Sequence, residues 1–361
     1  MHVGIVLNRT RGRLRTFVKH VLTNGYELLH GAPARMGVVL PEYDSFARVL
    51  DPSPVVVGTG DSIDWKALEE CELVIWEWGW SEDSPRLALE IKRRLSVPLL
   101  MFPGPLDRFW RELDEKDLAL QLEAAAATEA VGVMLRDTAP FYRHLMPSAH
   151  VFHMPVPVDI EYFGSFALER PQRTSSRVLL TAPTRFAGAG SQLPIATFVA
   201  FRDLVRKAPR LQGLCFVYSD DERVQASTAL KALGLEGRVE VASYMRPIGR
   251  YLRKVRDCAF GLFLPVELIQ GRMALVAACT KLPMVVSDDI ETHRTLYGRT
   301  AVKWYDTDAA VERCMRLIED GTFYDAVTAD AAAAIEYYAV DRCRERMLEG
   351  LGIALERRAA P

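Results

Sequence analysis

Short apolar runs alternate with longer helical patterns along most of the chain, and this alternation limits the possible folds more than any other feature. A run such as LLMF, residues 99–102, is apolar at every position, which is typical of a strand buried on both faces of a parallel sheet. Parallel strands need a crossover connection between them, and that crossover is usually a helix. The repeated strand–helix order therefore predicts an α/β protein with parallel sheets.

The strand–helix pattern occurs in two blocks, separated by the segment MPVPVDIEYFGSFALERPQRTSS. Three prolines and a polar Ser/Thr cluster predict a linker there. A chain of 361 residues also exceeds one ordinary domain. We therefore expect two Rossmann-like domains facing across a cleft, with ligands at the carboxyl ends of their strands. The expected bounds are 1–155 for the first domain, 156–175 for the linker, 176–338 for the second domain and 339–361 for a C-terminal helix that packs back on the first domain.

The expected elements follow from apolar periodicity and from the positions of Gly, Pro and Ser clusters. Strands are expected in the first block at residues 2–7, 36–40, 55–57, 73–76, 98–102, 130–134 and 151–154, and in the second block at residues 177–182, 213–218, 238–242, 258–263, 284–287 and 302–305. Helices are expected at residues 16–29, 85–95, 114–127, 193–207, 222–233, 248–255, 272–280 and 308–319. The last part, residues 323–356, is expected to hold two helices and no further strand.

Composition and charge exclude several classes of protein. The chain carries 45 Lys and Arg against 47 Asp and Glu, a net charge of −2, which argues against a globally basic nucleic-acid binder. Its six cysteines are scattered with no CxxC pair, which argues against a zinc knuckle or a disulfide framework and favours a reducing compartment. The N-terminus lacks the pattern of a signal peptide, and no apolar run is long enough to span a bilayer. We therefore expect a cytoplasmic protein without a transmembrane segment, with peripheral attachment to a membrane left open.

A glycine-containing segment, TAPTRFAGAGSQ, follows the first expected strand of the second domain and precedes a helix. Gly188 and Gly190 would let backbone N–H groups approach an anion, and the next helix N-terminus adds a positive dipole end. Arg185 would supply a fixed charge with two-pronged geometry for a diphosphate. The segment matches neither a GxGxxG nor a Walker A pattern, which would need Gly-Lys-Ser/Thr. The alternative is an ordinary connecting loop with an exposed Arg.

The stretch VELIQGRMALVAACTKLPMVV places a carboxylate and a Gly-Arg pair between an expected strand and an expected helix. Glu267 would accept hydrogen bonds from a pair of sugar or ribose hydroxyls. Gly271 and Arg272 lie at the start of the helix, where the macrodipole disfavours a basic side chain. A bound anion would explain why Arg272 stands there, and the alternative is a surface loop with an ordinary Glu and Arg.

The second domain also carries an ordered set of residues: Tyr251-Leu252, Asp257, an apolar strand ending at Pro265, Glu267, Gly271, Ala277 and Pro283-Met-Val-Val. This order resembles the C-terminal domain of retaining glycosyltransferases of family 4, which have the GT-B fold of two Rossmann-like domains. The segment VPVDIEYF resembles that family's linker, and the resemblance covers most of residues 150–340. The sequence departs from the family pattern at four points: no Ser follows Pro265, Glu267 is one or two residues out of register, Leu275 or Val276 replaces the second Glu, and Lys281 replaces the Gly before Pro283.

The resemblance implies transfer of a hexose from a nucleoside diphosphate sugar, with a UDP-sugar as the expected co-substrate and without a permanently bound cofactor or metal. Positive charges and helix dipoles would stabilise the leaving diphosphate instead. The expected catalytic residues are Arg185, Arg272, Glu267, Asp107 and Glu77. Donor binding is expected from Thr184, Gly188, Gly190, Tyr244, Met245 and Gly271.

The acceptor, a glycan, a lipid-linked group or a small molecule, is expected on the first domain. The loop NRTRGRLR follows the first strand, and its arginines would hold an anionic acceptor; a solvated surface loop is the alternative. In the run WEWGWSED, tryptophans at a strand's carboxyl end would stack on sugar faces, although alternation would put one of Trp76 and Trp78 in the core. An inverting enzyme would need a carboxylate base, for which Glu77 and Asp107 are candidates. The residues expected to bind the acceptor are Arg9, Arg11, Arg13, Trp78 and Trp80.

A fainter resemblance is to the β-glucosyltransferase of T-even phages, a GT-B enzyme that modifies DNA. It rests on Arg272 and on the segments TRFAGAGSQ and SDDIETHRTLYG, and it makes DNA an alternative acceptor, against which the near-neutral charge weighs.

The segment SDDIETH could hold a cation through its carboxylates and His293, but an N-cap at Asp289 is the preferred interpretation. Further alternatives are an epimerase or hydrolase of nucleotide sugars, and a non-catalytic GT-B-like binding protein, which the missing second Glu favours.

Overall fold

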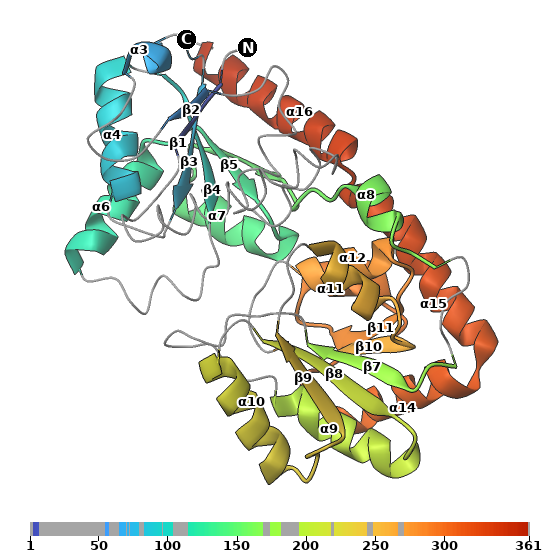
Figure 1. Ribbon diagram of the computed structural model, residues 1–361. Coiled ribbons are helices and arrows are strands. Elements are labelled where there is room, and N and C mark those ends of the chain that lie inside the picture. Colours follow the sequence, from blue (N-terminus) through green and yellow to red (C-terminus); the bar gives the residue numbers. More distant parts are fainter. Residues whose placement is uncertain are drawn as a thin grey trace. The chain divides into compact units, whose positions relative to one another are not determined.

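The computed structural model describes residues 3–6, 55–57, 65–69, 71, 73–78, 83–95, 97–103, 115–168, 174–181, 195–217, 220–243, 248–265 and 271–359 (Figure 1). The chain divides into two compact units, one of Met1–Val158 with Tyr338–Pro361 and one of Asp159–Tyr337. Each unit is built on a parallel sheet. Within the described part of the chain, no helix combines the length and the apolar character needed to cross a lipid bilayer.

The sheet of the first unit has the strand order β2-β1-β3-β4-β5-β6 in the described residues, and every neighbouring pair is parallel. Its strands are β1 (Val3–Val6), β2 (Val55–Val57), β3 (Leu73–Trp78), β4 (Leu99–Pro103), β5 (Ala130–Val133) and β6 (His150–His153). Its helical segments are α3 (Trp65–Glu69), α4 (Asp83–Leu95), α6 (Glu115–Ala126), η2 (Arg136–Thr138), α7 (Ala139–Leu145) and α16 (Val340–Ala359). All described residues of β4 and β5 are buried, as their continuous apolar sequences predict.

Trp76 on β3 is a central residue of the first unit's core. Its side chain is fully buried, and the indole Nε1 donates a hydrogen bond to Thr128 Oγ1 at 3.1 Å. The Thr128 hydroxyl in turn donates to Ala124 O at 2.9 Å, so the only polar atom of the indole is satisfied inside the core. This confirms that one of the two alternating tryptophans is a core residue.

Helix α16 packs against β5 and β6 of the first unit (Figure 1). The chain enters this helix beside Val158, whose N–H donates to Tyr338 O at 2.8 Å and which forms a parallel bridge with Ala339. Further along the helix, a Cβ at Gly350 would lie 2.7 Å from the ring of Phe152, so the absence of a side chain lets the helix approach β6. Residues after 338 therefore complete the first unit rather than the second.

The sheet of the second unit has the order β12-β11-β10-β7-β8-β9, with every neighbouring pair parallel. Its strands are β7 (Arg177–Thr181), β8 (Gln212–Val217), β9 (Val239–Ser243), β10 (Phe260–Phe263), β11 (Met284–Ser287) and β12 (Ala301–Val302). The chain starts at central strand β7, builds outward to β9, and then returns to β10 on the other side. This is the Rossmann order, in which ligands bind beyond the carboxyl ends of the two strands where the direction reverses, here β7 and β10.

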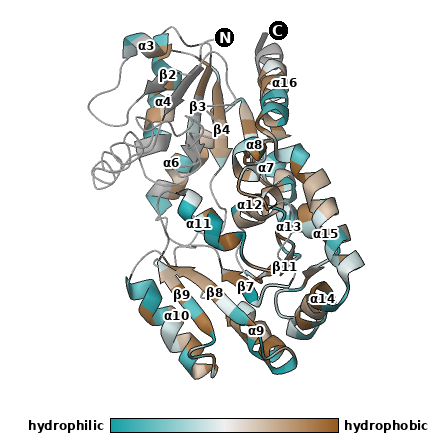
Figure 2. Ribbon diagram, turned by 45° about the vertical axis from the view of Figure 1, so that its right-hand side comes forward, coloured by the Kyte–Doolittle hydropathy of each residue, from teal (hydrophilic) through white to brown (hydrophobic). Residues whose placement is uncertain are grey.

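The helices of the second unit cover this sheet. They are α8 (Ile160–Gly164), α9 (Ile195–Lys207), α10 (Asp220–Ala232), α11 (Ile248–Val255), α12 (Arg272–Cys279), α13 (Glu291–Tyr297), α14 (Thr307–Glu319) and α15 (Gly321–Ala334), and η3 (Ile335–Tyr338) leads back to the first unit. Figure 2 shows β8 mainly in the colour of apolar residues, whereas much of α10 is hydrophilic. The predicted α/β fold class with parallel sheets is confirmed in both units.

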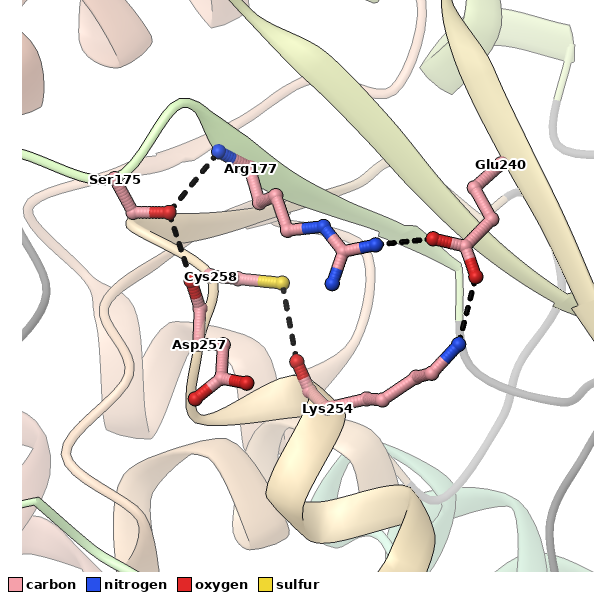
Figure 3. A network of polar contacts seen from close by, with 6 residues as sticks. All are labelled: Ser175, Arg177, Glu240, Lys254, Asp257 and Cys258. Carbon is pink, nitrogen blue, oxygen red and sulfur yellow. Dashed lines mark hydrogen bonds and ion pairs between the residues drawn. The ribbon is translucent and has the colours of Figure 1, made fainter.

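A network of polar contacts joins β7, β9, α11 and the turn before β10, on the side opposite the carboxyl ends of the strands (Figure 3). Glu240 on β9 forms ion pairs with Arg177 on β7 and with Lys254 on α11, the latter at 2.7 Å. Ser175 Oγ donates to Asp257 O at 2.7 Å and accepts from the Arg177 N–H at 3.1 Å. The network therefore connects segments of the second unit that lie far apart in the sequence.

Several elements differ from the sequence-based prediction. The segment interpreted as a linker contains α8, whose N-cap Asp159 accepts a hydrogen bond from the Tyr162 N–H at 2.9 Å. Helices α3, α7 and α13 were not predicted. The bounds of α11 and β11 are those expected. The expected strand at 36–40 and helix at 16–29 lie outside the described residues.

Candidate functional site

The strands β10 and β11 of the second unit end side by side, and the helices α12 and α13 begin beyond these ends. The end of β10 is held by a buried hydrogen bond, in which the Leu264 N–H donates to the hydroxyl of Thr197 on α9 at 2.9 Å. Thr197 itself is fully buried. Because this contact is shielded from water, it fixes the point at which the chain leaves the sheet toward α12.

Gly271 begins α12 in the left-handed region, with φ of 65°. A Cβ at this position would lie 2.8 Å from Thr292 Cβ and 3.3 Å from His293 Cδ2, both on α13. Glycine is therefore required at position 271 for two reasons. Its backbone takes a conformation that other residues rarely adopt, and α13 leaves no room for a side chain. The predicted donor-binding residue Gly271 thus lies where the starts of two helices meet.

The N-terminus of α12 has no capping side chain among the described residues. Its N-cap is Gly271, and its first turn contains no acidic residue. The first N–H groups of a helix carry the positive end of the dipole, which favours an anion and disfavours a cation. The half-buried Arg272 is nevertheless the first helical residue. Backbone donors and a guanidinium at one helix end form an arrangement that suits a phosphate.

The connection from β11 to α13 is a tight turn closed by its own side chains. Ser287 Oγ donates to Asp289 Oδ2 at 3.1 Å and accepts from the Asp289 N–H at 3.2 Å. Helix α13 has Ile290 rather than Asp289 at its N-cap position, with no side-chain hydrogen bond capping the helix. The predicted N-cap role of Asp289 is therefore wrong, because the Ser287 hydroxyl engages its carboxylate ahead of the cap.

His293 on α13 is completely buried next to the last residues of β10 and β11. Its Nδ1 lies 3.1 Å from Ser287 O, and its ring packs edge-on against Phe263 with a centroid distance of 6.1 Å. Burial lowers the pKa of His293 to about 4, so the ring is neutral at physiological pH. Sequence reasoning considered this histidine only as a cation ligand, and the structure places it against a backbone carbonyl.

The two carboxylates beside this histidine face a lysine. Lys303, which follows β12, lies 2.9 Å from Asp288 Oδ1 and 3.8 Å from Asp289 Oδ1. The hydrogen bond to Asp288 raises the pKa of Lys303. Within the described ranges, no cluster of three or more His, Cys, Asp or Glu residues is arranged to hold a metal ion.

The described residues include few of the predicted site residues. Gly271 and Arg272 are adjacent at the start of α12. Glu77 and Trp78 end β3, opposite Phe102 and Pro103 of β4, although their side chains lie outside the described part. The predicted residues that lie entirely outside it are Arg185, Glu267, Asp107, Thr184, Gly188, Gly190, Tyr244, Met245, Arg9, Arg11, Arg13 and Trp80.

The position at which the family resemblance expects a second glutamate is apolar and inside the core. Leu275, on the first turn of α12, exposes 2% of its surface, and the neighbouring Val276 is half-buried. The Leu275 N–H donates to Gly271 O at 3.2 Å in regular helical geometry. This turn of α12 therefore presents no carboxylate, and an anion at the helix start meets no negative side chain from Leu275 or Val276.

No family model matches the chain, and no curated protein matches it. The solved structures give a different result. Anabaena HepE in complex with UDP aligns over 98% of this chain and 100% of its own, with 12% identity and a TM-score of 0.68. The E. coli trehalose-6-phosphate protein bound with UDP-2-fluoro glucose aligns over 97% and 99%, with 12% identity and a TM-score of 0.70. The chain has the GT-B fold.

A third GT-B structure, a Staphylococcus aureus TarM mutant in complex with fondaparinux, alpha-GlcNAc-glycerol and UDP, aligns over 77% of this chain and 55% of its own, with 13% identity and a TM-score of 0.59. Because identities of 12–13% establish the fold alone, the chemistry of this GT-B protein has to be argued from its own residues. The features of the second unit on which such an argument rests are the Rossmann sheet, the start of α12 without a capping side chain among the described residues, and Arg272.

Proposed function

We propose that this protein is a glycosyltransferase that takes a hexose from a UDP-sugar. The observation that carries the proposal is the start of α12, where uncapped helical N–H groups and Arg272 lie next to the strand-order reversal of a Rossmann sheet. Solved structures of the same fold that align with 97–98% of the chain hold UDP or UDP-2-fluoro glucose, which supports a uridine nucleotide as the ligand. In this proposal, the diphosphate binds at the start of α12.

The chemistry assigned to this end of α12 is stabilisation of the leaving group. Breaking the bond between the sugar and the diphosphate develops negative charge on the phosphate oxygens. A guanidinium and prearranged backbone donors would stabilise that charge in the transition state. Arg272 supplies the first of these and the α12 N-terminus the second, and we propose that Arg185 with the Gly188 and Gly190 segment contributes from the turn after β7. Together these groups would make a bound metal unnecessary, so transfer should persist in excess chelator.

The remaining predicted residues complete the proposal as contacts to the rest of the donor and to the acceptor. Glu267 would bind sugar or ribose hydroxyls, and Thr184, Tyr244 and Met245 would line the donor site. If the reaction inverts the sugar, Glu77 or Asp107 would serve as the base that activates the acceptor hydroxyl. The acceptor would lie on the first unit against Arg9, Arg11, Arg13, Trp78 and Trp80.

The proposal is tested by measuring nucleotide binding by calorimetry and thermal shift. UDP and UDP-glucose should raise the melting temperature, because a ligand that binds only the folded state stabilises it by mass action. Arg272→Ala should weaken UDP binding about tenfold or more, because a charged hydrogen bond contributes about 1.5–3 kcal/mol. The matched control is Arg210→Ala, an exposed arginine in the turn before β8, at the opposite end of the sheet.

Equal UDP affinity in wild type and Arg272→Ala would remove Arg272 from the donor site. If UDP, GDP, ADP and dTDP and their sugars all left the wild-type melting temperature unchanged, the proposed function would be wrong. A GDP-, ADP- or dTDP-sugar binding in place of the UDP-sugar would keep the transferase proposal and change its donor.

The second candidate function is nucleotide-sugar binding without transfer. The buried Leu275 favours it, because the related sequence pattern has a glutamate in this part of the helix. Donor turnover separates the two candidates: release of UDP from UDP-glucose, by hydrolysis or by transfer to an added acceptor, supports the transferase. Tight binding of UDP-glucose without release of UDP, across glycan, lipid-linked, small-molecule and DNA acceptors, supports the binding protein.

A further inference from the structure

His293 has a ring nitrogen that no described residue provides with a hydrogen-bond partner. The side chain is completely buried, and among the described residues its Nε2 makes no hydrogen bond. A buried polar atom without a partner costs free energy comparable to a lost hydrogen bond, so such atoms are rare in folded proteins. Because no described residue satisfies this nitrogen of His293, a bound group is the candidate partner.

The other ring nitrogen determines the chemistry of this missing group. His293 Nδ1 lies 3.1 Å from Ser287 O, and a carbonyl oxygen only accepts hydrogen bonds. Nδ1 must therefore carry the proton, which leaves Nε2 of the neutral ring as an acceptor. The missing partner must donate a hydrogen bond, which excludes a fully ionised phosphate oxygen.

The position of this nitrogen relates it to the start of α12. Cδ2, the ring carbon bonded to Nε2, is the atom that a Cβ on Gly271 would meet at 3.3 Å. The Cδ2–Nε2 edge of the imidazole therefore faces the N-cap of α12, where the first N–H groups lack a capping side chain. An acceptor nitrogen and a set of backbone donors thus lie at the same helix end.

We propose that His293 Nε2 accepts a hydrogen bond from a hydroxyl of the bound nucleotide sugar. A hydroxyl donates and accepts at the same time, so it can satisfy Nε2 while it receives a hydrogen bond from an N–H group of α12. The inference rests on the proposed function and assigns a binding residue to its donor site. His293 would orient the donor rather than take part in proton transfer.

Two substitutions of His293 distinguish the contact made by Nδ1 from the contact proposed for Nε2. His293→Asn places an amide where Nδ1 lies and can keep the contact to Ser287 O, but it has no atom at the Nε2 position. His293→Gln reaches the Nε2 position with an amide oxygen and loses the contact to Ser287. We expect His293→Asn to weaken UDP-glucose binding about tenfold, the equivalent of about 1.4 kcal/mol, and His293→Gln to restore part of the affinity.

Calorimetry with UDP and with UDP-glucose identifies the hydroxyl. Weaker binding of UDP-glucose with unchanged binding of UDP assigns the contact to the transferred sugar, and equal weakening of both assigns it to the ribose. Unchanged affinity for both probes in a folded His293→Asn would overturn the inference and leave the proposed function standing. If the wild type bound neither UDP nor UDP-glucose, nor the GDP-, ADP- and dTDP-sugars, both the inference and the proposed function would be overturned.

A second measurement does not depend on how well the variants fold. Nitrogen NMR of the wild-type histidine ring should show the proton on Nδ1 in the free protein, and the Nε2 signal should shift when UDP-glucose binds. A proton on Nε2 in the free protein would contradict the inference, as would an Nε2 signal that UDP-glucose saturation leaves unmoved. This experiment decides the matter if His293→Asn unfolds.

Discussion

Gly271 and Thr292 lie so close that a Cβ on the glycine would be only 2.8 Å from Thr292 Cβ. The two residues come from the starts of α12 and α13, and their contact brings an uncapped helix end next to the buried His293. The left-handed backbone of Gly271 makes this approach possible. The geometry of the candidate site therefore depends on a residue without a side chain.

Gly271→Ala should destabilise the protein by about 2 kcal/mol or more, because it adds a strained left-handed alanine to a steric overlap. UDP binding should weaken as well, since α12 must move away from α13. Urea denaturation followed by circular dichroism measures the first effect and calorimetry the second. The matched control is Gly352→Ala in α16, where a Cβ meets nothing within 4 Å and helix propensity predicts a gain of about 0.5–1 kcal/mol. Similar small effects of both changes would contradict the steric argument.

Trp76→Phe should lower the free energy of unfolding by about 2 kcal/mol. The change leaves a cavity in the first unit's core and removes the indole donor to Thr128. Trp65→Phe is the control, because Trp65 is only partly buried, with Arg94 stacked 4.2 Å from its ring. Trp65→Phe should lower the free energy of unfolding by less than about 1 kcal/mol. Chemical denaturation of both variants tests the prediction, and equal losses would argue against the special position of Trp76.

Glu240→Gln should cost only about 0.5 kcal/mol at neutral pH, because the carboxylate is 40% exposed and solvent screens its two ion pairs. The hydrogen bond from Lys254 lowers the pKa of Glu240 below its ordinary value of 4.5. The stabilisation is therefore present above pH 4.5 and is lost as the pH falls through the lower pKa of the folded state. Urea titrations of wild type and variant should show a smaller difference at pH 3 than at pH 7, and 1 M salt should reduce the difference at pH 7.

His293 should make the protein less stable as the pH falls from about 7 to 4. Its pKa is about 4 in the folded protein against 6.5 for the ordinary residue, so in this window the unfolded chain binds the additional proton. The shift sets an upper limit of about 3 kcal/mol on the effect. Unfolding free energies measured across this pH range should decline less steeply in His293→Asn than in wild type. Parallel curves for the two proteins would show that the buried imidazole does not titrate in this way.

The elements that were predicted well are those in which apolar periodicity coincides with burial. Strand β11 and helix α11 have the expected bounds, because every residue of β11 is buried and α11 turns Tyr251, Leu252 and Val255 to the core. Helix α13 was missed for the opposite reason. Its buried residues include Glu291, Thr292 and His293, so no apolar stripe marks its inner face.

The candidate site was predicted only in part. Gly271 and Arg272 stand at the start of a helix as expected, since a glycine after an apolar strand marks such a start. The contacts of His293 with Phe263 and of Thr197 with Leu264 had no signal in the sequence, because each joins segments that lie far apart in the chain. Asp289 was assigned as an N-cap from its residue type, which does not reveal that the Ser287 hydroxyl would engage it first.

The sequence by itself determined the fold class and most of the strands and helices, because these depend on the spacing of apolar residues over short stretches. Only the tertiary structure decided the order of strands in each sheet and the contact of Gly271 with α13. These features depend on packing between residues far apart in the chain, where many arrangements satisfy the same local pattern and the close fit of side chains selects one.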